Sequence, residues 1–314
     1  MKTKIPIRFF IITFVWTWLF LTPLVLIGIE IIPYNIDCFP IISSIMRIIA
    51  FFGPVAGAFI SLYSLKGKDS IIKYLKSFLS FNFGWKVWLS IFFVISIISI
   101  IAWIIPDFFG KNRLPVNFPN VYIFPLYLII QLFIGTFFGG GQEEVGWRGY
   151  ILPYLEKRFG LILGSLIIGI IWCVWHFPLK FIPGTFQSYM SFFDFGGYFL
   201  FTIGLSYFFS WIKEISSNRL MSGLIVHGTV NAFAGLFPYL IMESNMKQVG
   251  FWIYSILIFI IGMIIVIIRT HKKKRLLPKF VKRNAKNMEM GIILKIKGLE
   301  LLICLTNNDK SDKI

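Results

Sequence analysis

Long apolar runs are the feature of this sequence that most restricts its fold. A hydrocarbon core about 30 Å thick requires about 20 apolar residues per spanning helix, and runs of that length are too long for core strands. We expect about eight spans, at Phe9–Ile29, Ile41–Leu65, Val87–Ile105, from about Val121, Leu161–Phe181, Phe192–Ile212, Leu220–Ile241 and Phe251–Ile268. The sequence therefore predicts an all-α, polytopic membrane protein.

The composition agrees with a membrane protein. Hydrophobic residues make up 57% of the 314 residues and charged residues 14%, whereas soluble domains are about 25% charged. The first run has no small-residue cleavage site and continues through Pro23 to Ile29, so we expect a retained helix rather than a signal peptide. The net charge of +17 would suggest nucleic acid in a soluble protein, but in a membrane protein the location of the basic residues matters more. We expect no nucleic-acid partner.

Basic residues alternate between the loops that join the expected spans. Alternate loops hold few of them, namely Lys111, Arg113, Lys180 and Lys247, with Arg47 near one edge. The other loops and the termini hold many, at Lys2, Lys4, Arg8, Lys66, Lys68, Lys73, Lys76, Lys86, Lys157, Arg158, Lys213, Arg219, Arg269, Lys272, Lys273, Lys274 and Arg275. Because Lys and Arg collect in cytoplasmic loops, this alternation predicts a cell-membrane protein with both termini in the cytoplasm.

The last part of the chain differs from the rest. Residues 271–314 begin with a basic run and continue into the short, lysine-interrupted segment Gly291–Leu305. Such a segment is expected to lie on the membrane surface, and the basic run favours anionic lipids. We therefore expect a membrane domain over residues 1–270 and a basic cytoplasmic tail over residues 271–314.

A few polar residues fall within or beside the apolar runs. Ionisable residues at membrane depth are costly and indicate function by default. The third histidine, His271, belongs to the basic tail. The polar residues within or beside the apolar runs are Glu143, Glu144, Arg148, His176, His227 and Asn231.

The positions of these residues predict that they meet. We assume a fourth helix that runs on through Glu143 toward Glu156, kinks at Pro153 and forms an antiparallel hairpin that turns near Phe159–Gly160. His176 then lies level with Glu143, because both are about 24 Å of helix from the turn. His227 lies about 15 Å from the cytoplasmic end of its own helix. Three helices would thus surround one intramembrane polar cavity.

Spacing within each helix suggests separate roles. Glu144 and Arg148 are four residues apart, so they can form an ion pair that low dielectric makes nearly obligatory. Glu143 points about 100° away and lacks this partner; a carboxylate in a poorly solvated site beside a histidine suits a general base. His227 and Asn231 share a face and can donate hydrogen bonds to an oxyanion.

Each of these features also has an interpretation without catalysis. The glutamates and the arginine would form a solvated helix end, and His176 would belong to an interfacial aromatic belt. His227 and Asn231 would make an interhelical hydrogen-bonding pair. Gly139–Gly141 would serve helix packing. Cys173, three residues before His176, would be a buried structural cysteine rather than a nucleophile.

Three short motifs together resemble the CAAX-protease and bacteriocin-processing family (CPBP or Abi), which includes Rce1-type prenyl endopeptidases. The family's EExxxR motif corresponds to "EEVGWR" at Glu143–Arg148, FxxxH to "WCVWH" at Trp172–His176, and HxxxN to "HGTVN" at His227–Asn231. The motif core covers residues 139–234. Trp172 stands where phenylalanine is usual, and we expect this exchange to matter little.

The resemblance implies an intramembrane endopeptidase. It assigns Glu143 as the catalytic carboxylate, and His176 would help to hold the attacking water. His227 and Asn231 would stabilise the tetrahedral intermediate or contribute metal ligands. The residues expected to support the site are Glu144, Arg148 and Trp172.

The sequence leaves open whether the site binds a metal ion. The family is described as metalloproteases, and a metal-free glutamate mechanism has also been argued for it. The sequence lacks HExxH, which puts two ligands and a base on one helix. A Zn²⁺ site would use Glu143, His176 and His227, with a water as the fourth ligand.

The sequence also leaves open which substrate is cleaved and whether the chain has one of three other functions. By the resemblance the substrate is a membrane-associated or hydrophobic peptide, either prenylated and CAAX-like or bacteriocin- or pheromone-like. The alternatives are a non-enzymatic immunity or partner-binding protein, an ion-coupled transporter, and a cysteine protease that uses Cys173 and His176. The cysteines, Cys38, Cys173 and Cys304, include no CxxC pair and predict neither disulfides nor a thiolate metal cluster.

Overall fold

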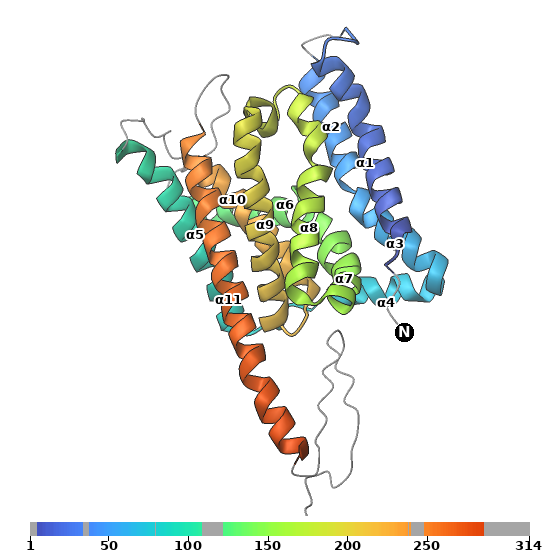
Figure 1. Cartoon of the computed structure of the whole chain (residues 1–314). Coiled ribbons are helices and arrows are strands. Elements are labelled where there is room, and N and C mark those ends of the chain that lie inside the picture. The colour runs from blue at the N-terminus through green and yellow to red at the C-terminus, as the bar shows by residue number, and fades with distance from the viewer. Residues whose placement is uncertain are drawn as a thin grey trace, which may run out of the picture. The chain divides into compact units, whose positions relative to one another are not determined.

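The computed structural model of the chain describes residues 5–33, 38–78, 80–108, 122–237, 239 and 248–285, with side chains up to residue 271. The described ranges are helical and contain no strand (Figure 1). The chain divides into two compact units, residues 1–266 and 267–314. The expected interfacial segment Gly291–Leu305 lies outside the described residues.

The all-α, polytopic architecture is confirmed. Six helices in the described part are long and apolar enough to cross a membrane. The elements in chain order are α1 (Ile7–Gly28), α2 (Phe39–Phe51), α3 (Gly53–Lys66), α4 (Lys68–Phe78), α5 (Trp85–Phe108), α6 (Phe124–Phe137), η1 (Val145–Ile151), α7 (Leu152–Phe159), α8 (Leu161–Trp175), η2 (Phe177–Phe181), η3 (Phe186–Tyr189), α9 (Phe192–Ile215), α10 (Leu220–Leu236) and α11 (Val249–Ala285).

Two of the expected spans are shorter than the rest. The fourth corresponds to α6, which has 14 residues, and the seventh to α10, which has 17. The second expected span corresponds to α2 and α3 together, with a local break at Phe52. Pro54 lies in the first turn of α3, where its missing N–H costs no helical hydrogen bond.

The assumed continuous fourth helix is wrong. Helix α6 ends at Phe137, and Gly140 has a φ of +119°, a backbone conformation open to glycine and strained for other residues. The chain then re-enters helical structure at Glu143 and passes through the π-helix η1 into α7. From Glu143 to Phe159 the chain is continuously helical, as expected, and Pro153 lies in the first turn of α7 directly after the π-helix.

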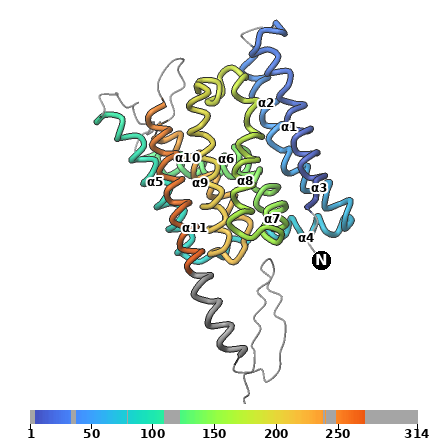
Figure 2. The backbone as a smooth tube through the Cα atoms, viewed as in Figure 1, coloured from blue at the N-terminus to red at the C-terminus, as the bar shows by residue number. Residues whose placement is uncertain are grey.

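The expected hairpin is present despite this break. Helices α7 and α8 pack against each other on either side of Gly160. Helix α8 ends at Trp175, so that His176 is its C-terminal cap. The loop that follows contains η2 and η3 and leads into α9, which packs beside α8 (Figure 2). This connection places the loop 177–190 next to His176.

Helices α6 and α10 approach each other unusually closely. A Cβ atom on Gly135 would lie 2.9 Å from the Gly228 carbonyl oxygen, and one on Gly228 would lie 2.7 Å from the Thr136 backbone nitrogen. Small residues permit such contact between membrane helices. The contact brings His227, the neighbour of Gly228, against the segment that carries the glutamates.

Candidate active site

Glu144 and Arg148 form a buried ion pair, as expected from their spacing. The Arg148 Nη1 atom lies 3.0 Å from Glu144 Oε1, and Arg148 Nη2 donates to Ser206 Oγ on α9 at 2.9 Å. The guanidinium carbon lies 4.5 Å from the ring centroid of Trp172 and 4.2 Å from that of Phe209. Glu144 and Arg148 are 1% and 3% exposed. A solvated helix end is therefore the wrong interpretation of this group.

Glu144 also fixes the orientation of His227, which the sequence did not predict. His227 Nδ1 lies 2.9 Å from Glu144 Oε1. Because a carboxylate accepts, the Nδ1 atom carries the hydrogen. The opposite nitrogen, Nε2, then faces Gly140, where an added Cβ would collide with it. The glycine thus leaves room for the imidazole at the pocket.

Glu143 occupies a different environment from its neighbour. Its Oε2 atom accepts a hydrogen bond of 2.8 Å from the Trp172 indole Nε1 and lies 4.0 Å from His176 Nε2. The residue is 2% exposed. In the described part of the chain it has no Lys or Arg within salt-bridge distance. The expected separation of a paired and an unpaired glutamate is therefore present.

His176 is oriented by the helix that it caps. Its Nδ1 atom lies 2.9 Å from the Trp172 carbonyl oxygen, which can only accept, so Nε2 is left bare toward Glu143. The ring packs 4.6 Å from the ring of Trp175 and 6.2 Å from that of Phe51. His176 is buried and does not lie at an exposed interfacial belt.

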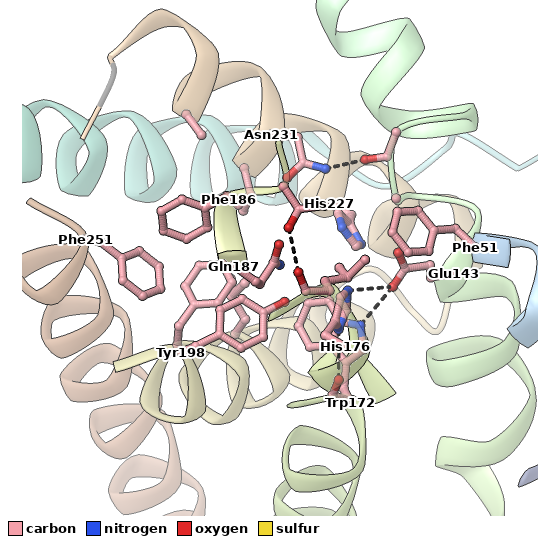
Figure 3. A pocket seen from close by; sticks show the side chains of 18 of the residues that line it. Phe51, Glu143, Trp172, His176, Phe186, Gln187, Tyr198, His227, Asn231 and Phe251 are labelled. Carbon is pink, nitrogen blue, oxygen red and sulfur yellow. Dashed lines mark hydrogen bonds and ion pairs between the residues drawn. The ribbon is translucent and has the colours of Figure 1, made fainter. Parts of the chain in front are cut away.

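Asn231 faces the same pocket as His227, in agreement with their spacing. Its Nδ2 atom donates to the Gly139 carbonyl oxygen (Figure 3). An amide nitrogen carries two hydrogens, so one donor stays available. His227 binds Glu144 and Asn231 binds Gly139, so both residues of α10 also hold this helix to the segment that follows α6. The two residues therefore make structural hydrogen bonds and line the pocket as well.

Glu143, His176, His227 and Asn231 line one cavity of about 310 Å³ (Figure 3). The sequence did not predict several of the residues that line this cavity, because neither the loop 177–190 nor α9 contains a motif that indicates a site. Gln187 and Tyr198 line this cavity, and Arg47 on α2 reaches the same space. The remaining apolar wall consists mainly of rings and aliphatic side chains, namely Phe51, Leu179, Phe186, Phe201, Leu205, Phe209, Val230, Tyr239 and Phe251.

Cys173 does not belong to this cavity. It is 4% exposed and is not among the lining residues. Within the described residues, the His176 ring nitrogens contact the Trp172 carbonyl oxygen and the Glu143 carboxylate. A Cys173–His176 catalytic pair is therefore wrong.

The metal question turns on how the possible ligands are arranged. Both histidines bind an acceptor through Nδ1 and keep Nε2 for the pocket, as metal-bound histidines do. However, the described residues contain no group of three or more His, Cys, Asp or Glu side chains placed to hold a metal ion. Two imidazoles line the pocket, but the described side chains do not gather a complete ligand set.

Comparison with known proteins identifies the same region. Residues 125–233 match the family described as "Type II CAAX prenyl endopeptidase Rce1-like". The chain is also 30% identical to CAAX prenyl protease 2 of Methanococcus maripaludis over 107 residues, which are 33% of this chain. Residues 125–233 of this chain are thus similar to the CPBP family, and this match covers about a third of the chain. The aligned part spans 38% of the length of the curated relative.

The three CPBP motifs come together in space although long segments separate them in sequence. The first motif supplies the two glutamates and Arg148 from the segment after α6. The second supplies Trp172 and His176 from the end of α8, and the third supplies His227 from α10. The motif core thus forms one site within a polytopic membrane protein.

Proposed function

We propose that this chain is an intramembrane endopeptidase that hydrolyses a peptide bond with a water activated by Glu143. The observation that carries the proposal is the placement of Glu143, His176 and His227 around one buried cavity. The CPBP family match supports a protease.

The distance between Glu143 and His176 suits a shared water molecule. Their Oε2 and Nε2 atoms are 4.0 Å apart. A water molecule about 2.8 Å from each atom would donate one hydrogen bond to Glu143 and the other to His176, with an angle of about 90° between the two bonds. Glu143 would take one proton as the water oxygen bonds to the substrate carbonyl carbon, while the bare Nε2 of His176 accepts the other hydrogen bond.

The tetrahedral intermediate then needs donors for its oxyanion. His227, protonated and supported by Glu144 through Nδ1, would donate from Nε2. The second amide hydrogen of Asn231 would add another donor. Glu143 would return its proton to the leaving nitrogen as the C–N bond breaks, which restores the carboxylate and completes hydrolysis.

The same three side chains would hold a Zn²⁺ ion. If bound, zinc would supply Lewis acidity toward the scissile carbonyl. Because Glu143 Oε2 already accepts the Trp172 indole and no complete ligand group is present among the described residues, we favour the metal-free glutamate reaction.

We further propose a hydrophobic or lipidated peptide as the substrate. The cavity wall is mainly aromatic and aliphatic, which suits apolar side chains or an attached lipid. Among the residues that the structure describes, Arg47 hydrogen-bonds to Ser43 and Ser44 and makes no ion pair. It could therefore receive a carboxylate, which favours a peptide cleaved near its C-terminus.

The test is cleavage by purified Glu143→Gln in detergent or liposomes. A farnesylated CAAX-type peptide and the same peptide without the lipid serve as substrates, beside mass spectrometry of membrane peptides. We expect wild-type cleavage and a loss of at least a hundredfold in Glu143→Gln. The control Glu30→Gln changes an exposed glutamate and should retain activity.

The outcome separates this function from the remaining alternatives. Full cleavage by a folded Glu143→Gln protein would contradict the mechanism. A cellular immunity phenotype that survives this substitution would favour a non-enzymatic role. Ion flux in liposomes that depends on Glu143 or Glu144 would favour a transporter.

A further inference from the structure

We propose that Trp172 is a positioning residue: its indole N–H holds the Glu143 carboxylate in place for catalysis. This inference rests on the proposed function. It concerns the one motif position at which the chain departs from the usual CPBP phenylalanine, an exchange that the sequence suggested would matter little. A phenylalanine has no donor, so the hydrogen bond is a property of this chain.

The hydrogen bond is the main restraint on the Glu143 side chain. It measures 2.8 Å, and both residues are 2% exposed. In the described part of the chain, the indole is the one hydrogen-bond donor to the Glu143 side chain. The nearest ionisable partner, His176 Nε2, is 4.0 Å away. Without the indole, the carboxylate would rotate more freely within the cavity.

Trp172 also orients the other group that would hold the water. Its backbone carbonyl accepts from His176 Nδ1 at 2.9 Å. One helical turn therefore sets both the Glu143 oxygen and the bare His176 nitrogen. Because this bond uses the backbone carbonyl, a side-chain change at position 172 removes the donor to Glu143 without removing the acceptor for His176.

The aromatic ring itself has a separate, structural task. The Arg148 guanidinium stacks on its face at 4.5 Å, and its ring lies 5.5 Å from that of His227. A role in packing alone predicts that shape matters and the N–H does not. A positioning role predicts that the N–H matters even when shape is kept.

The decisive variant replaces Trp172 by 3-benzothienylalanine, which keeps the bicyclic shape and substitutes sulfur for the N–H. We expect kcat to fall about tenfold to a hundredfold, as for loss of a hydrogen bond to a charged group, with KM unchanged. Trp172→Phe should show the same split. The same replacement at Trp147, which is fully buried and whose indole nitrogen has no hydrogen-bond partner among the described residues, should leave kcat unchanged.

A spectroscopic measurement tests the bond independently of cleavage. In protein labelled with ¹⁵N at the tryptophan indoles, the Trp172 signal is assigned by its loss in Trp172→Phe. We expect Glu143→Ala to shift that signal and to speed its hydrogen exchange. No response to Glu143→Ala, or full kcat in the benzothienylalanine variant, would overturn the inference.

These results also separate the inference from the proposed function. If the wild type cleaves no peptide, the proposed function fails, while the indole signal still reports whether Trp172 holds Glu143. If the wild type cleaves and the variant at position 172 does so equally well, the endopeptidase stands and the positioning role is refuted.

Discussion

At the scale of single residues, Glu143 and Glu144 illustrate how neighbours in sequence acquire different tasks. Glu144 receives a guanidinium and an imidazole, so its charge is compensated. Glu143 receives one neutral donor and faces the cavity. A buried carboxylate without a cation is costly, and such a cost is expected where the group is needed for chemistry rather than for folding.

The same Glu→Gln substitution should therefore lower the stability of the protein at Glu144 and its cleavage activity at Glu143. Glu144→Gln leaves the Arg148 charge buried without its partner, which costs about 3–5 kcal/mol of stability. Glu143→Gln keeps an acceptor for Trp172 and should unfold near the wild-type temperature while losing cleavage. Thermal unfolding in detergent measures both. Equal melting temperatures for the two variants would contradict this division.

A double variant supplies the control for the charge argument. Glu144→Gln combined with Arg148→Met removes both charges and should unfold at a higher temperature than Glu144→Gln alone. If the double variant is less stable than the single one, packing of the arginine between the Trp172 and Phe209 rings outweighs the ion pair.

Chelation tests the role of a metal at the same residues. Because the described side chains present no complete ligand group, we expect cleavage to persist after treatment with EDTA and 1,10-phenanthroline. The measurement is the initial rate before treatment, after treatment and after zinc is added back. Loss of cleavage that zinc restores would replace the metal-free reaction with a zinc-dependent one at Glu143, His176 and His227.

At the scale of elements, the break between α6 and η1 decides the geometry of the site. A continuous helix would carry Glu143 along a straight axis, whereas the turn at residues 138–142 redirects the chain. Asn231 binds this turn through the Gly139 carbonyl, and η1 follows as a π-helix, a type frequent at functional sites. The turn thus joins the first and third motifs.

Gly140→Ala should disable the site through this turn. The position has a φ of +119°, and an added Cβ would collide with His227 Nε2. We expect a loss of about 1–3 kcal/mol from backbone strain and at least a tenfold fall in cleavage rate. Gly84→Ala, where an added Cβ meets nothing within 4 Å, is the matched control. Wild-type cleavage by Gly140→Ala would contradict the required close approach.

At the scale of the whole molecule, the chain is a multi-pass membrane protein whose orientation is still a prediction. The alternation of basic loops predicts that the N-terminus, the Lys66–Lys86 region and the tail from Lys272 lie in the cytoplasm. Long apolar helices set the number of crossings, and the charges between them set the direction.

Reporter fusions in a bacterial host test this orientation. Green fluorescent protein fused after residue 314 should fluoresce, because it folds in the cytoplasm. Alkaline phosphatase inserted after Arg113 should be active, because that loop is expected outside. An active phosphatase after residue 314 would reverse the predicted topology.

The sequence by itself determined the helical membrane architecture, the separation of a paired from an unpaired glutamate, and the three motifs that meet. These follow from local spacing and hydropathy, which depend on few neighbours. It did not predict the break after Phe137, the Glu144–His227 contact or the Trp172–Glu143 hydrogen bond. Each of these depends on how separate helices pack, because a donor finds its acceptor only after glycines such as Gly135 and Gly228 let the backbones approach. Tertiary structure alone therefore decided which atom faces which.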